Sequence, residues 1–137
     1  MIWYETLYFL KKIYFLKPQR GKDIILKELT KKCLHYYDSY PVYAGLLGRV
    51  LLWDVKEPIE IKIVYKKGTL SDYLSVINRV DYPLLSIRVL EIKKDIELIK
   101  RDGLSSKPAV YICKGKTCAR PVTSPDEVLK TIKGFIS

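Results

Sequence analysis

The sequence has few of the side chains on which enzymes most often rely. His35 is the only histidine among 137 residues, Gln19 is the only glutamine and Asn78 is the only asparagine. With a single histidine, general acid–base catalysis of the common kind has few candidates. Glycine-rich phosphate loops, paired carboxylates and Ser/His/Asp arrangements are absent as recognisable motifs. The sequence therefore argues against an autonomous enzyme, and it predicts no catalytic residue and no cofactor.

The scarcity of amides, together with abundant lysine, glutamate and isoleucine, is typical of proteins from thermophiles. Amide side chains deamidate at high temperature, whereas networks of charged side chains contribute relatively more to stability there. Intracellular disulfides are rare in mesophiles but genuine in hyperthermophiles. A disulfide in this chain would therefore be compatible with an intracellular protein.

Long uninterrupted apolar runs are also missing. Residues 1–16 are apolar but lack a basic start and a small-residue cleavage site, and Glu5, Lys11 and Lys12 interrupt them. This pattern does not fit a signal peptide, and the segment is too short to span a bilayer. We expect a cytoplasmic protein with no membrane partner.

Acidic side chains are fewer than basic ones. The sequence has 25 Lys and Arg and 15 Asp and Glu, which gives a formal net charge of +10. Residues 1–57 carry 10 basic and 6 acidic side chains, and residues 58–137 carry 15 and 9. The excess is spread along the chain, whereas a nucleic-acid surface concentrates its basic groups on one face. A solvated surface is the preferred interpretation. A basic nucleic-acid-binding protein is an alternative, and it would show steeply salt-dependent binding.

The first 57 residues are predicted to form a layer of about three helices. Residues 2–16 are apolar almost all the way round, with a narrow polar strip at Glu5 and Lys12. A second helix is expected over residues 23–38, and a third follows Pro41 and runs to Trp53. A helix that is apolar on most sides is normally buried.

Two further helices can cover only part of the first one. An uncovered apolar patch of more than a few hundred Å² is unusual on a soluble monomer. We therefore expect an oligomer, with a two-fold dimer as the simplest form. Its interface candidates are Trp3, Phe9 and Phe15.

Two glycines, Gly45 and Gly48, fall inside the predicted third helix. Each should cost about 1 kcal/mol relative to alanine in a helix. Close approach of a neighbouring backbone is the compensation that we expect.

Residues 58–137 are predicted to form a small α/β domain of the βαβαβ type. Alternating or continuous apolar runs indicate strands over residues 59–65 and 84–92 and a third after Pro108. Amphipathic segments between and after them indicate helices from residue 69 or 71 to about 80, and over 95–104 and 127–135. Strands separated by helical segments favour right-handed crossovers. The predicted fold class is therefore α/β, with a three- to four-stranded, mostly parallel sheet and flanking helices.

A hairpin bounded by two cysteines closes this domain. Cys113 and Cys118 flank residues 114–117, a four-residue loop in which Gly115 can take positive φ. The cysteines should face each other, and Pro121 in the following short strand fits only a sheet edge. A structural disulfide or paired thiols, redox exchange and metal binding all remain open for this pair.

The remaining candidate ligands do not favour a metal. Zinc needs two more ligands, and Cys33 and His35 lie two positions apart on a helix, so they point in different directions. Cys33 belongs to the apolar face of its helix, where an inert thiol is expected. The sequence therefore predicts no metal site.

The ending of the chain carries a resemblance to a known family. The residues concerned are Tyr111-Ile112-Cys113, Cys118, Pro121, Thr123 and Pro125-Asp126-Glu127, together with Tyr40-Pro41 and residues 58–64. They resemble the C-terminal region of the YyaL-like, spermatogenesis-associated thioredoxin-domain family. Members of that family are several times longer, with an N-terminal thioredoxin-like domain and an (α/α) barrel, and thiol-redox or carbohydrate-related activity is suspected for them.

The resemblance implies a free-standing C-terminal piece of such a protein. This chain has no Cys-x-x-Cys and lacks nearly the whole barrel, so catalytic groups of those parts cannot be carried over. Residues 1–57 would be a remnant of the barrel. The expected function is a non-catalytic interaction or structural module, whose partner is a second copy or a separately encoded barrel or thioredoxin-domain protein. Thiol-redox chemistry at Cys113 and Cys118 is the alternative.

Overall fold

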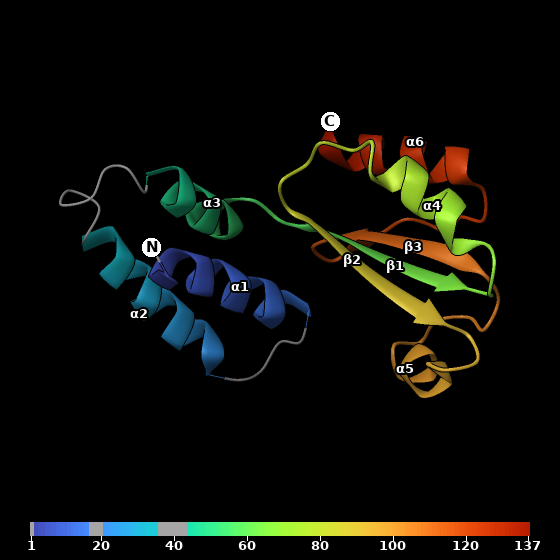
Figure 1. Ribbon diagram of the computed structural model, residues 1–137, viewed down its shortest axis with the longest axis horizontal. Coiled ribbons are helices and arrows are strands. Elements are labelled where there is room, and N and C mark those ends of the chain that lie inside the picture. The colour runs from blue at the N-terminus through green and yellow to red at the C-terminus, as the bar shows by residue number, and fades with distance from the viewer. Residues whose placement is uncertain (1, 17–20, 36–43) are drawn as a thin grey trace. The chain divides into compact units, whose positions relative to one another are not determined.

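The computed structural model describes residues 2–16, 21–35 and 44–137, with only the backbone given for residues 2, 3 and 16. The chain divides into two compact units, Met1–Glu57 and Pro58–Ser137. We describe each unit by itself. Figure 1 shows their elements in sequence colours.

The helical unit contains α1 (Ile2–Leu16), α2 (Lys22–His35) and α3 (Ala44–Val55). The predicted end of the second helix and the predicted start of the third lie outside the described residues. None of the described helices combines the length and the apolar character needed to cross a membrane.

The core of the helical unit is small. Leu7, Leu26 and Val50, one from each helix, form its buried centre. Lys11 lies beside them with 6% of its surface exposed. Its Nζ donates to the carbonyl oxygen of Val50 at 3.2 Å and forms an ion pair with Asp54. Because a buried amine needs such partners, Lys11 ties α1 to α3.

The close backbone contact expected at the two helical glycines is absent. A Cβ added at Gly45 or Gly48 would meet nothing within 4 Å in the described structure. The expectation of a neighbouring backbone is therefore wrong for this unit taken alone. Both glycines are exposed, so their entropic cost has no visible compensation there.

This geometry gives the first testable prediction. Gly48→Ala is expected to stabilise the helical unit by about 1 kcal/mol, because the space is open and alanine restricts the unfolded chain. Gly21→Ala is the matched control, and it should destabilise the unit because Gly21 has φ +82°. Both tryptophans, Trp3 and Trp53, lie in residues 1–57, so denaturation followed by their fluorescence reports on this unit. Destabilisation by both substitutions would contradict the open space at residue 48.

The α/β unit contains four strands and three helices. They are β1 (Ile59–Tyr65), α4 (Leu70–Ile77), β2 (Leu85–Glu91), α5 (Ile96–Arg101), β3 (Ala109–Lys114), β4 (Thr117–Cys118) and α6 (Pro125–Ile136). The sheet has the order β2-β1-β3-β4. The predicted α/β class with helices flanking the sheet is confirmed.

The predicted direction of β3 is wrong, whereas the parallel pairing of β1 with β2 and the antiparallel hairpin around the cysteines are as predicted. Only β1 and β2 are parallel, while β3 runs antiparallel to β1 and β4 runs antiparallel to β3. The connection from β2 to β3 stays at the end of the sheet where β2 finishes, because Ile99 of α5 is buried there against Val64 and Leu90. The chain therefore enters β3 from that end.

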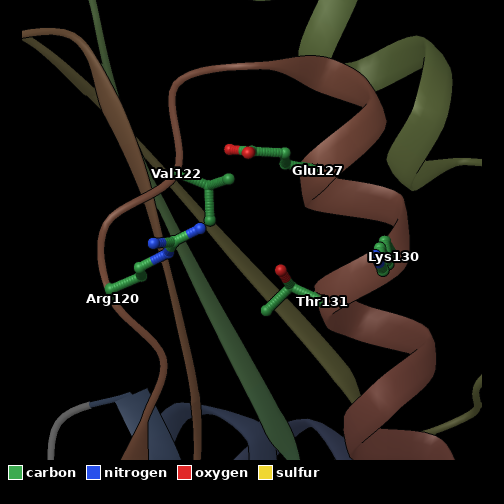
Figure 2. A pocket seen from close by; sticks show the side chains of 5 residues that line it. All are labelled: Arg120, Val122, Glu127, Lys130 and Thr131. Atoms are coloured by element: carbon green, nitrogen blue, oxygen red, sulfur yellow. The ribbon is translucent and has the colours of Figure 1, made fainter.

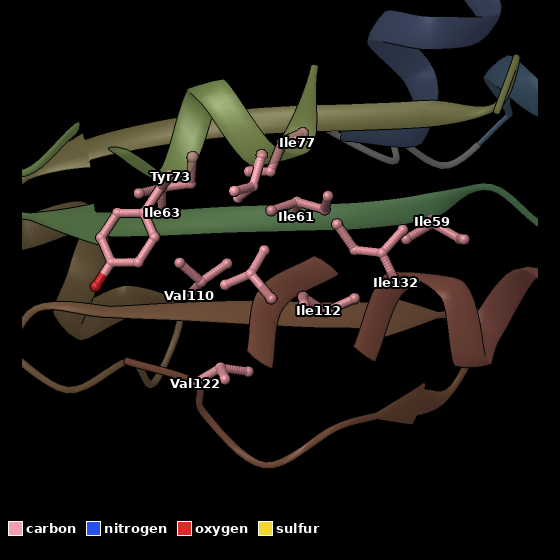
Figure 3. Packing of buried hydrophobic residues seen from close by; sticks show 11 residues of the cluster. Ile59, Ile61, Ile63, Tyr73, Ile77, Val110, Ile112, Val122 and Ile132 are labelled. Atoms are coloured by element: carbon pink, nitrogen blue, oxygen red, sulfur yellow. The ribbon is translucent and has the colours of Figure 1, made fainter. Parts of the chain in front are cut away.

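The two faces of the sheet have different covers. Ile59, Ile61 and Ile63 of β1 alternate onto the face covered by α4 and α6, and Figure 3 shows Ile59 near Ile132 of α6 and Ile63 near Tyr73 of α4. On the opposite face Val64 packs with β2 and α5. Figure 1 shows α5 alone on that side, at one end of the sheet. The rest of that face, which includes Cys113, is left to polar side chains.

Candidate functional site

The β3–β4 hairpin brings the two predicted cysteines together. Cys113 and Cys118 are register partners, with 4.0 Å between their Cα atoms, and they form a disulfide. The loop between the strands is shorter than predicted, since only Gly115 and Lys116 separate Lys114 from Thr117. Gly115 has φ +57° and Lys116 has negative φ, which is the pattern of a II′ turn. The glycine selects this turn, and the turn sets the register that pairs the sulfurs.

The two sulfurs occupy different environments. Cys118 is exposed on the edge strand β4, whereas Cys113 is half-buried between β4 and β1. Glu60 lies directly opposite Cys113 on β1, so the two side chains share a face at a Cβ separation of about 5 Å. The disulfide is therefore open to solvent on one side and lined by a carboxylate on the other.

A polar cluster continues from Glu60 across this face. The Lys62 amine lies 3.6 Å from carboxylate oxygens of both Glu60 and Asp102. The Arg88 guanidinium donates to Asp102 at 2.8 Å. Asp102 follows α5 directly, so the cluster fastens α5 to β1 and β2. The sequence analysis missed it, although polar residues at alternate positions of the two strands were a usable signal.

The segment that follows β4 forms no strand of its own, and an isolated bridge holds it to β3. Val110 and Val122 exchange two backbone hydrogen bonds of 2.7 and 2.9 Å. Between this pair and β4, Arg120 and Pro121 together oppose the single residue Tyr111, which makes a bulge. Pro121 thus lies at the sheet edge, as predicted, where its missing N–H costs no ladder bond.

The third cysteine lies in the helical unit. Cys33 is half-buried on α2, and burial raises the pKa of its thiol, an effect that the nearby Lys11 amine partly offsets. The Tyr4 hydroxyl donates to the Cys33 carbonyl oxygen at 3.1 Å. Burial also raises the pKa of Tyr4. A protonated, partly covered thiol of this kind fits the predicted inert role.

Metal coordination has no visible centre in the part of the chain that the structure describes. No three or more His, Cys, Asp or Glu side chains come together there in a way that could hold an ion. His35 is exposed at the end of α2.

The predicted interface residues of α1 differ in their surroundings. Phe9 has 61% of its surface exposed. Phe15 is half-buried, with its ring 5.7 Å from the Trp53 ring in an edge contact. The side chain of Trp3 lies outside the described residues. Phe9 is thus the predicted interface residue that the helical unit itself leaves uncovered.

Reducing the disulfide gives the second prediction. Chain entropy for a loop of about six residues corresponds to about 2 kcal/mol of stabilisation. The buried core of the α/β unit does not include the hairpin cysteines, so the reduced unit should stay folded at room temperature with a lower melting temperature. Calorimetry with and without reductant measures the shift, and a Cys113→Ser/Cys118→Ser variant should show none. Unfolding of the unit on reduction would mean that the hairpin holds the core together.

Comparisons with known proteins give similarity to solved structures but not to a family model or a curated protein. Among solved structures, the chain is similar to a thioredoxin-2 that is described as a component of the malaria parasite protein secretion machinery. The identity is 13% and the TM-score is 0.46, over 57% of this chain and 84% of that one.

Proposed function

We propose that this chain is a non-catalytic interaction module whose helical unit binds a second copy of the chain through α1. The observation that carries the proposal is an apolar stripe on α1. Phe9, Leu10 and Ile13 expose 61%, 37% and 42% of their surfaces. Their spacing of one, three and four residues places them on one side of the helix. An exposed apolar stripe of this kind commonly marks a contact surface.

The stripe on α1 is preferred over the exposed apolar residues of α2. Ile24 and Ile25 are also exposed, but Lys27, Glu28 and Lys31 share the exposed surface of that helix. Charged residues are depleted at the centres of protein interfaces. The uninterrupted stripe of α1 therefore fits an interface better.

The charges beside the stripe favour a second copy as the partner. Glu5 and Lys12 lie on the same side of Phe9, about 40° and 60° around the helix at 100° per residue. In an antiparallel two-fold pair centred on Phe9, Glu5 of one helix comes next to Lys12 of the other, and the contact occurs twice. Opposite charges at both ends make the surface complementary to itself.

The test measures the mass in solution of the native chain and of variants in which the charges of Glu5 and Lys12 are reversed. Light scattering should report a dimer at micromolar concentration. Glu5→Lys and Lys12→Glu should each weaken it by about tenfold, because each turns two attractive pairs into two repulsive ones. The double variant restores both pairs and should recover the dimer. A native monomer, or a double variant weaker than either single one, would contradict the proposal.

The same proposal accounts for the resemblance of the chain to the C-terminal region of the YyaL-like family. There, helices corresponding to residues 1–57 would pack against other barrel helices, so a helix-to-helix contact of α1 is in keeping with the resemblance. A separately encoded barrel or thioredoxin-domain protein is the other occupant of the stripe. It becomes the interpretation to pursue if the native chain proves monomeric.

Thiol–disulfide exchange at the hairpin is a second candidate function, favoured by the exposure of Cys118. An external thiolate would attack Cys118 Sγ, the bond to Cys113 would break, and Cys113 would leave as a thiolate that takes a proton from water. The Glu60 carboxylate beside Cys113 disfavours negative charge there, which slows this departure and makes Cys118 the attacking thiol in the reduced protein. In a Cys33→Ser background, Cys118 alone should form mixed disulfides with oxidised glutathione at least about tenfold faster than Cys113 alone. Equal rates would contradict this asymmetry.

A further inference from the structure

A hollow lies between α6 and the segment that follows the hairpin. Its volume is about 350 Å³, and its walls are Arg120, Val122, Glu127, Lys130 and Thr131. This volume lies at the lower end of the range of small-molecule sites. Figure 2 shows Arg120 reaching in from the segment, with Glu127 and Thr131 reaching toward it from α6.

Both walls of the hollow are fixed by neighbouring structure. The Val110–Val122 hydrogen bonds hold the segment at one side. Val128 and Ile132, which are fully buried, anchor α6 in the core at the other. Val122 lies beneath the hollow with only 4% of its surface exposed, so the open surface comes mainly from Arg120, Glu127, Lys130 and Thr131. The polar groups therefore project from a rigid frame, which lowers the ordering cost of binding.

The charged groups of the hollow are not paired with each other. Arg120, Glu127 and Lys130 have no ion pair or side-chain hydrogen bond within the described part of the chain. Arg120 and Glu127 face the same space from opposite walls (Figure 2), yet they form no ion pair with each other. The Arg120 guanidinium and the Glu127 carboxylate lie on opposite sides of the hollow, and the space between them has room for a ligand that bridges them.

We infer that the hollow binds a small zwitterion with an apolar side chain, such as a free aliphatic amino acid. Its carboxylate pairs with Arg120, whose planar fork matches carboxylate geometry, and Lys130 adds a second positive charge. Its ammonium pairs with Glu127, and its side chain lies beside Thr131 and over the small exposed part of Val122. A simple anion fits less well because Glu127 repels it, and a simple amine meets the same difficulty at Arg120 and Lys130.

The test uses L-leucine and two analogues that each lack one charge. Titration into the isotope-labelled full chain, followed by the methyl signals of Val122 and Thr131, should give saturable shifts with a millimolar dissociation constant, in keeping with the small size of the ligand. 4-Methylpentanoate, which lacks the amine, and 3-methylbutylamine, which lacks the carboxylate, should bind at least about fivefold more weakly. Equal binding of either analogue would overturn the zwitterion assignment.

Substitutions locate the site. Arg120→Gln and Glu127→Gln should each weaken leucine binding by at least about fivefold. Lys133→Gln is the control on the same helix outside the hollow, and it should change nothing. All three residues are exposed, so the variants are expected to fold, which their amide spectra check directly. Absence of saturable shifts in the native chain, or unchanged binding by Arg120→Gln, would overturn the inference whatever the outcome for the dimer.

Discussion

Replacing Ile61 with alanine is expected to lower the free energy of unfolding of the α/β unit by about 3 kcal/mol. Ile61 lies in the middle of β1 with no exposed surface, in the cluster that joins the sheet to α4 and α6. The substitution removes buried methyl and methylene groups and leaves a cavity that a sheet core refills poorly. A loss of this size is a large part of the stability of a small domain.

The matched control is Ile87→Ala. Ile87 is the register partner of Ile61 on β2, on the same face of the sheet, but it exposes 38% of its surface. Its truncation should cost clearly less, about 1 kcal/mol. Hydrogen exchange of β1 and β3 amides measures the unfolding of this unit, because both tryptophans lie in the other one. Equal losses at both positions would mean that the edge strand is covered by something else in solution.

The sequence predicted the elements of the fold better than their directions. The strict alternation of residues 59–65 gave the bounds of β1, and the apolar run of residues 2–16 gave those of α1. The direction of β3 was wrong because the connection from β2 to β3 is long enough either to recross the sheet or to stay at one end. Burial of Ile99 of α5 against Val64 and Leu90 keeps it at one end, and composition and periodicity do not report such a tertiary contact.

The burial of individual side chains on α1 was hardest to predict from the sequence. Lys11 interrupts an apolar run, and the structure buries it against Val50 and Asp54. Phe9 belongs to the same run, yet the helical unit leaves it exposed. Hydrophobicity alone would predict that Lys11 is exposed and Phe9 is buried. The pairing of the cysteines was predictable because local turn chemistry sets it, whereas the hollow beside Arg120 depends on where a bulge and a distant helix come together.

Association through α1 would explain why Phe9 is exposed in the single chain although Lys11 of the same helix is buried. Among the described residues of the helical unit, the central cluster consists of Leu7, Leu26 and Val50, so burying the α1 stripe against a second copy would add to a small buried apolar area. A contact between two helices of 15 residues is small compared with standard interfaces. The dimer should therefore be of micromolar rather than nanomolar affinity, and it should be sensitive to single substitutions at its centre.

Phe9→Asp should convert this dimer into a monomer. The two-fold axis passes beside Phe9, so one substitution removes two aromatic contacts and places two carboxylates next to each other. Each lost aromatic burial is worth about 2 kcal/mol, and the like charges add to it, so the dissociation constant should rise by about a thousandfold. Light scattering across a concentration series measures it, with Ile24→Asp as the control. Ile24, on α2, is 64% exposed, so this variant introduces the same charge at a similarly open apolar position and should leave the dimer intact. Dissociation by both variants would place α2 in the interface, and dissociation by neither would remove α1 from it.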